Sequence, residues 1–190
     1  MIIDQVLLRS ILRNHKSYEW TFQGFGMIRT YLDDQKRWRL NVWHPKMRTH
    51  GVSDIHDHPW SFTSHVLVGR IKNIVYHHKP TDLIAPSHHR VVIKTGENKQ
   101  VIEPPTDVGL GVYPDQVILA GGSYFQHRSE IHRTEAEPGT VTLNDRSPAT
   151  LSYTAQVFYP YGTEWVPATP RKATSSEIYL ALDTALERLV

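Results

Sequence analysis

The chain has 190 residues, of which 39% are apolar and 21% charged, and its formal net charge is +2. This length predicts one domain over residues 1–190, and the composition excludes a disordered chain. Lysine and arginine are dispersed, without the basic stripe that binds nucleic acid, so no nucleic-acid partner is expected. No apolar run reaches the roughly 18 residues of a membrane span, and the N-terminus lacks signal-peptide features, which predicts a cytoplasmic protein without membrane contact.

The spacing of apolar residues changes along the chain from a helical period to the alternation of β-strands. Residues 2–13 have the spacing of a short amphipathic helix, and residues 26–32 and 37–44 then alternate as the two strands of a hairpin. Short runs rich in β-branched and aromatic residues predict further strands at 61–68, 71–76, 90–94, 99–102, 116–119, 140–143 and 150–158. The segment 77–89 is the most irregular and is expected to be a loop.

The C-terminal segment again has a helical pattern. Thr174 and Glu177 form a capping-box sequence, and the apolar stripe that follows predicts a helix over about 175–189. This helix would lie on the rest of the domain or on a partner subunit. Many short strands separated by turns, with no βαβ alternation, predict an all-β sandwich, jelly roll or barrel over about residues 20–168.

Histidine is the unusual residue of this composition. The chain has 12 histidines and no cysteine, so a bound metal would be held by imidazole nitrogen or by oxygen. In the segment "SDIHDHPWSFTSHVLVG", His56 and His58 are two residues apart and would share one face of a strand. The same alternation places Trp60 and Phe62 on that face and His65 on the other. A third ligand is expected from "GGSYFQHRSEIHRTE", which contains His127 and His132.

These two segments resemble the signature motifs of the cupin superfamily. The first has the form G-x4-HxH-x10-G and the second the form G-x-Y-x7-HR. The resemblance implies a cupin-like double-stranded β-helix, a jelly-roll barrel in which His56, His58 and His132 are metal ligands. His127 is the alternative third ligand if the alignment of the second motif shifts.

One departure from the cupin pattern narrows the predicted chemistry. Phe62 stands where a typical cupin has a glutamate ligand, and a three-histidine set is similar to that of cysteine dioxygenase-like cupins. The resemblance therefore implies a mononuclear non-haem Fe(II) dioxygenase, an oxidoreductase that takes O₂ and a small-molecule substrate, although Zn, Ni or Mn are alternative metals. Without an anionic ligand the metal keeps its full charge, which favours a polar, anionic or chelating substrate.

Other residues near the motifs have alternative interpretations. Trp60, Phe62, Tyr124 and Tyr153 would line the pocket or fill the core. Asp57 should face away from the metal and hold the loop through hydrogen bonds, and Arg133 should point outward.

Two other functions remain open. They are a zinc-dependent hydrolase or isomerase, and a non-catalytic cupin that binds a small ligand. A homodimer is also expected from the tail helix and the strand edges.

Overall fold

The computed structural model describes residues 3–80, 85–95, 100–148, 154–168 and 170–189. Within these residues the strands form two antiparallel sheets. The first sheet has the order β11 (Ser123–Gln126), β5 (Phe62–Val68), β13 (Thr140–Arg146), β3 (Trp38–Arg48), β2 (Phe25–Tyr31), β1 (Thr21–Phe22) and β15 (Arg171–Lys172). The second has the order β10 (Gln116–Leu119), β6 (Arg70–Lys79), β12 (Ile131–Ala136), β4 (Ile55–His56), β14 (Ala155–Pro160), β7 (His88–Thr95) and β8 (Gln100–Ile102), and β9 (Thr106–Val112) pairs with β6 and β7.

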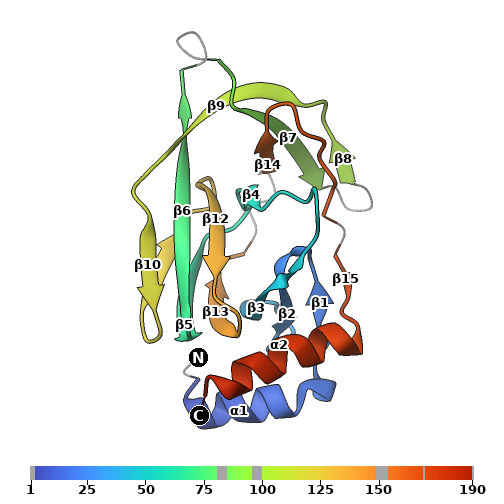
Figure 1. Ribbon diagram of the computed structural model, residues 1–190, viewed down its shortest axis with the longest axis vertical. Helices are drawn as coiled ribbons and strands as arrows, with labels where there is room; N and C mark the ends of the chain where they lie inside the picture. The colour runs from blue at the N-terminus through green and yellow to red at the C-terminus, as the bar shows by residue number, and fades with distance from the viewer. Residues whose placement is uncertain (1–2, 81–84, 96–99, 149–153, 169, 190) are drawn as a thin grey trace.

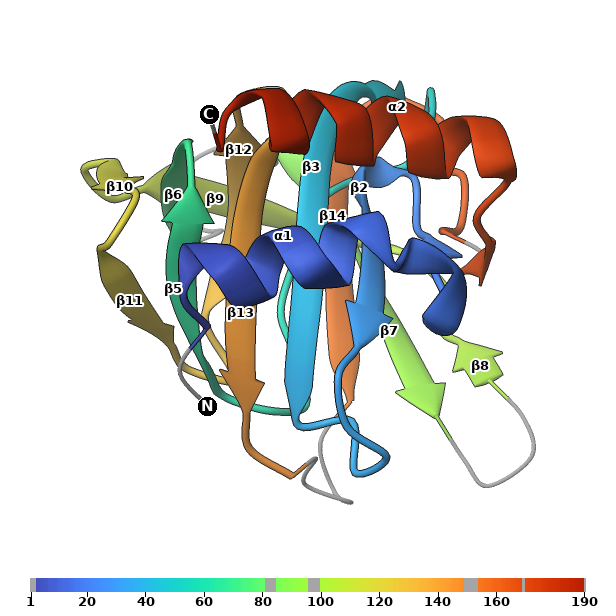
Figure 2. The same cartoon turned by 90° about the horizontal axis from the view of Figure 1, so that it is seen from below.

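Two helices, α1 (Gln5–Arg13) and α2 (Ser175–Glu187), cover one face of the first sheet (Figures 1 and 2). The helix predicted over 2–13 begins at Gln5 because the Asp4 side chain caps it, accepting a hydrogen bond from the Leu7 amide at 2.8 Å. The predicted capping box of α2 is confirmed, with Thr174 and Glu177 each bonding the other's backbone amide. Of the two positions predicted for the tail helix, the structure shows the one on its own chain, against β2 and β3.

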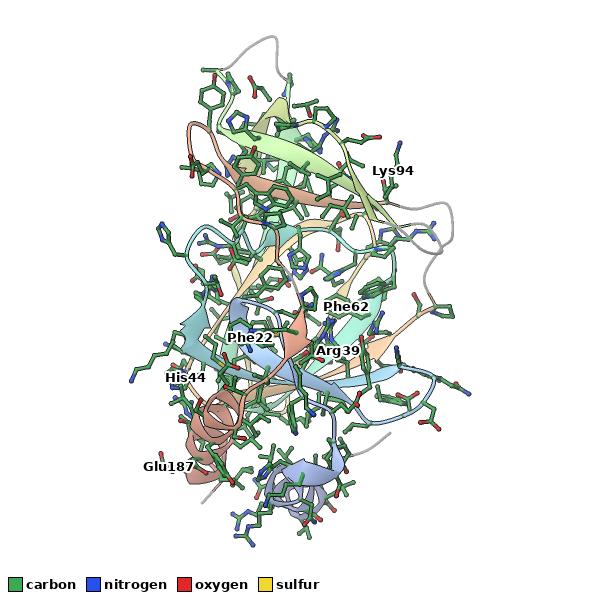
Figure 3. All side chains as sticks on the ribbon, turned by 90° about the vertical axis from the view of Figure 1, so that its right-hand side faces the viewer. Phe22, Arg39, His44, Phe62, Lys94 and Glu187 are labelled. Carbon is green, nitrogen blue, oxygen red and sulfur yellow. The ribbon has the colours of Figure 1, made fainter. Side chains whose placement is uncertain are left out.

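The β2–β3 hairpin has a different layer on each of its two faces. Ile28, Leu40 and Val42 point to the helices and belong to the main apolar core. Because successive strand residues point to opposite faces, residues one position away, such as Arg39, face the second sheet instead. Arg39 lies in the interior of the molecule near Phe62 (Figure 3). Both faces of β3 are covered, so its residues 39–44 are all buried.

The structure corrects the predicted loop over 77–89. β6 continues through Lys79 and β7 begins at His88, so His77, His78, His88 and His89 belong to strands. Residues 81–84 lie outside the described part of the chain, as do residues 149–153 at the start of the strand predicted over 150–158. Five strands outside the predicted ranges, β1, β9, β11, β12 and β15, complete the two sheets.

The predicted all-β class with two terminal helices is confirmed at the level of a two-sheet sandwich. The jelly-roll topology of a cupin and the single-domain organisation stay predictions. No helix in the described residues is both long and apolar enough to span a membrane.

Candidate metal centre

Strand pairing brings His56 and His132 together. β12 pairs with β4 so that His132 lies directly opposite His56 in the second sheet. Directly opposite residues of an antiparallel pair have side chains on the same face, and the two imidazole centroids lie 5.1 Å apart. Residues 76 positions apart in the chain are thus placed at one site by backbone register.

His58 reaches the same site by a different route from the predicted one. β4 ends at His56, so the prediction that His56 and His58 share one strand face is wrong. From His56 the chain leaves the second sheet and enters the first at Phe62. Its course is fixed by backbone hydrogen bonds from Asp57 N to Gln156 O and from His58 N to Arg128 O, each 3.1 Å. We call residues 57–61 the crossover segment.

The three imidazoles face one another. One potential ligand atom from each of His56, His58 and His132 lies within 4.8 Å of the others. The Nε2 atoms of His58 and His132 are 3.2 Å apart. Two nitrogens that bind one ion at about 2.1 Å each lie roughly 3.0–3.4 Å apart. The spacing therefore fits two ligands of a common cation.

Oxygen acceptors orient two of the rings. His56 Nδ1 lies 2.8 Å from the Asp54 carbonyl oxygen, and His132 Nδ1 lies 3.2 Å from Asn73 Oδ1. Each contact favours the tautomer that carries its proton on Nδ1, which leaves the Nε2 lone pair free for a metal. Such contacts behind the ligand are typical of metal-binding histidines.

Electrostatics keep these imidazoles neutral. Burial lowers the pKa of His56 and lowers the pKa of His58 and His132 well below the usual value. The positive charge of Arg39 adds to this effect on all three rings, and the proximity of His56 further opposes protonation of His58 and His132. Neutral imidazole is the form that binds metal, so the donor set fits a divalent cation.

The three histidines line a cavity of about 200 Å³ between the two sheets, which we call the histidine cavity. Aromatic rings form one of its walls. Phe62 lies 5.3 Å from His58 and 6.0 Å from His132 between ring centroids, and Trp60 is stacked on His58 at 5.3 Å. The predicted lining by Trp60, Phe62 and Tyr124 matches the structure, and Tyr153 lies outside the described residues.

Phe62 stands at the sequence position where the resemblance led us to expect a glutamate. Its ring packs against two of the imidazoles. Within the described residues, no carboxylate joins the three-histidine group. Along β5 the predicted alternation holds, with Phe62, Ser64, Val66 and Val68 buried and His65 partly exposed.

His127, the alternative third ligand, is not brought to the group. Its side chain is exposed, and its Nδ1 lies 2.9 Å from Ser129 Oγ. It lies in the turn before β12, four residues before the start of that strand. His127 is therefore a suitable control position for experiments on the three-histidine group.

Two further predictions concern residues adjacent to the ligands. Asp57 is buried, and its carboxylate accepts hydrogen bonds from Gln156 N at 2.6 Å and Gln156 Nε2 at 2.7 Å, which holds the crossover segment against β14. Arg133 forms an ion pair with Glu135 at 2.6 Å and does not line the histidine cavity, as predicted.

Three arginines around the cavity were not predicted from the sequence. Arg29 and Arg39 line it, and Arg39 is only 4% exposed. Arg146 places its guanidinium 3.9 Å from the ring centroid of Trp60, behind the wall stacked on His58. Arg39 is one of the polar residues of the alternating segment 37–44. The alternation placed these residues on one face of a strand, but what that face contacts was not predicted.

Comparisons with known proteins add no family. No protein-family model matches the sequence, and no curated protein matches it.

Proposed function

We propose that this protein is a metal-dependent enzyme of the cupin type, and specifically a mononuclear non-haem Fe(II) dioxygenase that acts on a small polar or anionic substrate. The observation that carries the proposal is the convergence of three neutral imidazoles, joined by no carboxylate of the described residues, in a cavity walled by aromatic rings. Three neutral ligands leave up to three positions on an octahedral ion for substrate and O₂. A bound Fe(II) would supply the activation of O₂.

The protein's own residues have separate roles in this proposal. His56, His58 and His132 would bind the metal, and Asp54 and Asn73 orient two of these rings through the contacts to Nδ1. Trp60 and Phe62 limit the access of water to the imidazoles, which strengthens electrostatic interactions inside the cavity.

A zinc enzyme is the second candidate, because three imidazoles with an open position are also the ligand set of catalytic zinc. Zinc would lower the pKa of a bound water and serve hydrolysis or isomerisation. The dioxygenase and the zinc enzyme differ in the bound metal and in whether O₂ is consumed. A non-catalytic binding protein differs from both because it would not convert its ligand.

Metal content is the first test. The full chain, purified without a histidine tag and analysed by elemental analysis, should hold about one Fe per chain, whereas one Zn per chain would favour the second candidate. His58→Ala and His132→Ala should each lose the metal, and His127→Ala should retain it because His127 lies outside the group. Equal metal content in all four proteins would contradict the three-histidine site.

Oxygen uptake is the second test. The protein would be loaded with Fe(II) anaerobically and mixed with thiols, diketones and small organic acids in air-saturated buffer. Substrate-dependent O₂ consumption that disappears in His132→Ala supports the dioxygenase. Metal binding without O₂ consumption across the panel contradicts it.

A further inference from the structure

The wall of the histidine cavity contributed by the first sheet carries positive charge without a neutralising partner. Arg29 and Arg39 lie on the same face of the β2–β3 hairpin, with Arg29 opposite Asn41 and Arg39 opposite Tyr31. They are diagonal neighbours across the two strands, with Cα atoms expected to be roughly 7–8 Å apart. Like charges at this separation repel, so the pair is unfavourable unless something negative lies near it.

Within the described part of the chain, neither guanidinium has a hydrogen-bond or ion-pair partner, and the Nε atoms of both are buried and unpaired. Burial lowers the pKa of Arg39 to about 9, with Arg29 and Arg146 adding to the effect. A buried, unpaired cation is one of the most costly groups in a folded protein. A second cation beside it increases that cost.

The acidic residues of the cavity do not supply the missing charge. Asp54 forms an ion pair with Arg48 at 2.5 Å, and Asp57 is bonded to Gln156. A divalent metal on the three imidazoles would add two positive charges to the same space. The cavity therefore has an excess of positive charge that a bound anion would neutralise.

We infer that Arg29 and Arg39 form an anion-binding subsite of the histidine cavity, and that the ligand is a small organic acid with two negative charges. This inference rests on the proposed function for the role of the metal, which would bind one end of the ligand while the arginines bind the other. Two guanidiniums present several N–H donors in planar arrays that match carboxylate or phosphate oxygens. The volume of about 200 Å³ suits a small molecule.

Binding of simple anions to the metal-free full chain tests the subsite independently of the metal. The probes are malonate and inorganic phosphate, at mildly alkaline pH where both are dianions, with acetate as the monoanion and malonamide as the uncharged analogue of malonate. Isothermal titration should show that a dianion binds more tightly than acetate, and that malonamide does not bind. The tighter of the two dianions identifies the subsite as one for carboxylate or for phosphate.

Variants assign the binding to the two arginines. Arg39→Met and Arg29→Met should each weaken binding of the dianion roughly 10- to 100-fold, as expected for the loss of hydrogen bonds to a charged group. Arg39→Lys keeps the charge and should bind at an intermediate level. Lys94→Met is the matched control, because it removes one positive charge from an exposed residue paired with Glu103, outside the cavity lining.

Two results would overturn the inference: no dianion binding to the wild-type chain, or equal binding by wild type and both arginine-to-methionine variants. Far-ultraviolet circular dichroism of each variant shows whether it is folded. If Arg39→Met is unfolded, the binding of the dianion is compared between wild type and Arg29→Met. A wild-type chain that binds metal but no dianion refutes this inference and leaves the proposed function intact. Intact dianion binding in a chain that binds no metal refutes the proposed function alone.

Discussion

The two faces of the β2–β3 hairpin differ in the kind of side chain that they carry. The face toward α1 and α2 is apolar, with Ile28, Leu40 and Val42 fully buried in the main core. The face toward the histidine cavity is partly exposed along β2 and buried along β3, and it carries Arg29 and the buried Arg39, both with unpaired Nε atoms. A face that lowers stability is expected at a functional site, where local rules of folding are broken. One face of the hairpin therefore contributes to stability, and the other is the face to which we assign the proposed anion-binding subsite.

The largest effect is expected on the helix side. Leu40→Ala should lower the free energy of unfolding of the metal-free protein by about 2–5 kcal/mol, because it removes buried methyl groups and leaves a cavity. Urea denaturation measures the change, and the folded fraction should still bind metal at the wild-type stoichiometry. Val6→Ala on α1 is the control, because Val6 is 78% exposed and its truncation should change stability by less than about 0.5 kcal/mol.

The cavity side should respond with the opposite sign. Arg39→Met should raise the free energy of unfolding of the ligand-free protein by about 1–3 kcal/mol, because an apolar side chain of similar length replaces a buried, unpaired cation. The same urea titration measures it. A loss of stability as large as that of Leu40→Ala would show that the Arg39 side chain stabilises the fold, as Leu40 does.

A third variant extends the comparison to the second sheet. Asn73→Leu removes the acceptor behind His132 Nδ1 and should weaken metal binding about 10- to 100-fold. Competition with a chromophoric chelator measures the affinity. Asn73→Asp retains an oxygen acceptor and should recover most of the affinity, so equal losses in both variants would exclude an orienting role for Asn73.

The smallest effect is expected at the start of α2, remote from the cavity. Pairing with Arg171 and the Thr174 cap lower the pKa of Glu177 from 4.5 to about 2. A carboxylate with a lowered pKa stabilises the fold above its unfolded pKa, and this contribution is lost as the pH falls toward 2. Glu177→Gln should cost about 1 kcal/mol or less at neutral pH, since the pair is partly exposed.

Denaturation as a function of pH checks this assignment. The difference between wild type and Glu177→Gln should shrink as the pH falls from about 5 to about 2. A difference that stays constant over this interval would mean that the Glu177 charge does not act on the helix cap.

Local patterns predicted the elements but not the environment of their polar faces. The alternation of segment 37–44 identified a strand, and the capping box identified the start of α2, because both depend on near neighbours. The alternation could not show that Arg39 faces a cavity, because the second sheet is formed by residues distant in the chain. The three histidines were predicted from the spacing of His56 and His58 and from the resemblance of the second motif. The route of His58 was not predicted, because it depends on hydrogen bonds to residues distant in the chain.

The crossover segment has a mechanical consequence for the sandwich. His58 lies on the chain that joins the two sheets, while His56 and His132 both belong to the second sheet. A cation bound by all three would tether this connection to the second sheet and restrict its separation from β12. Hydrogen exchange at the amides of Asp57 and His58 should therefore slow when metal is added.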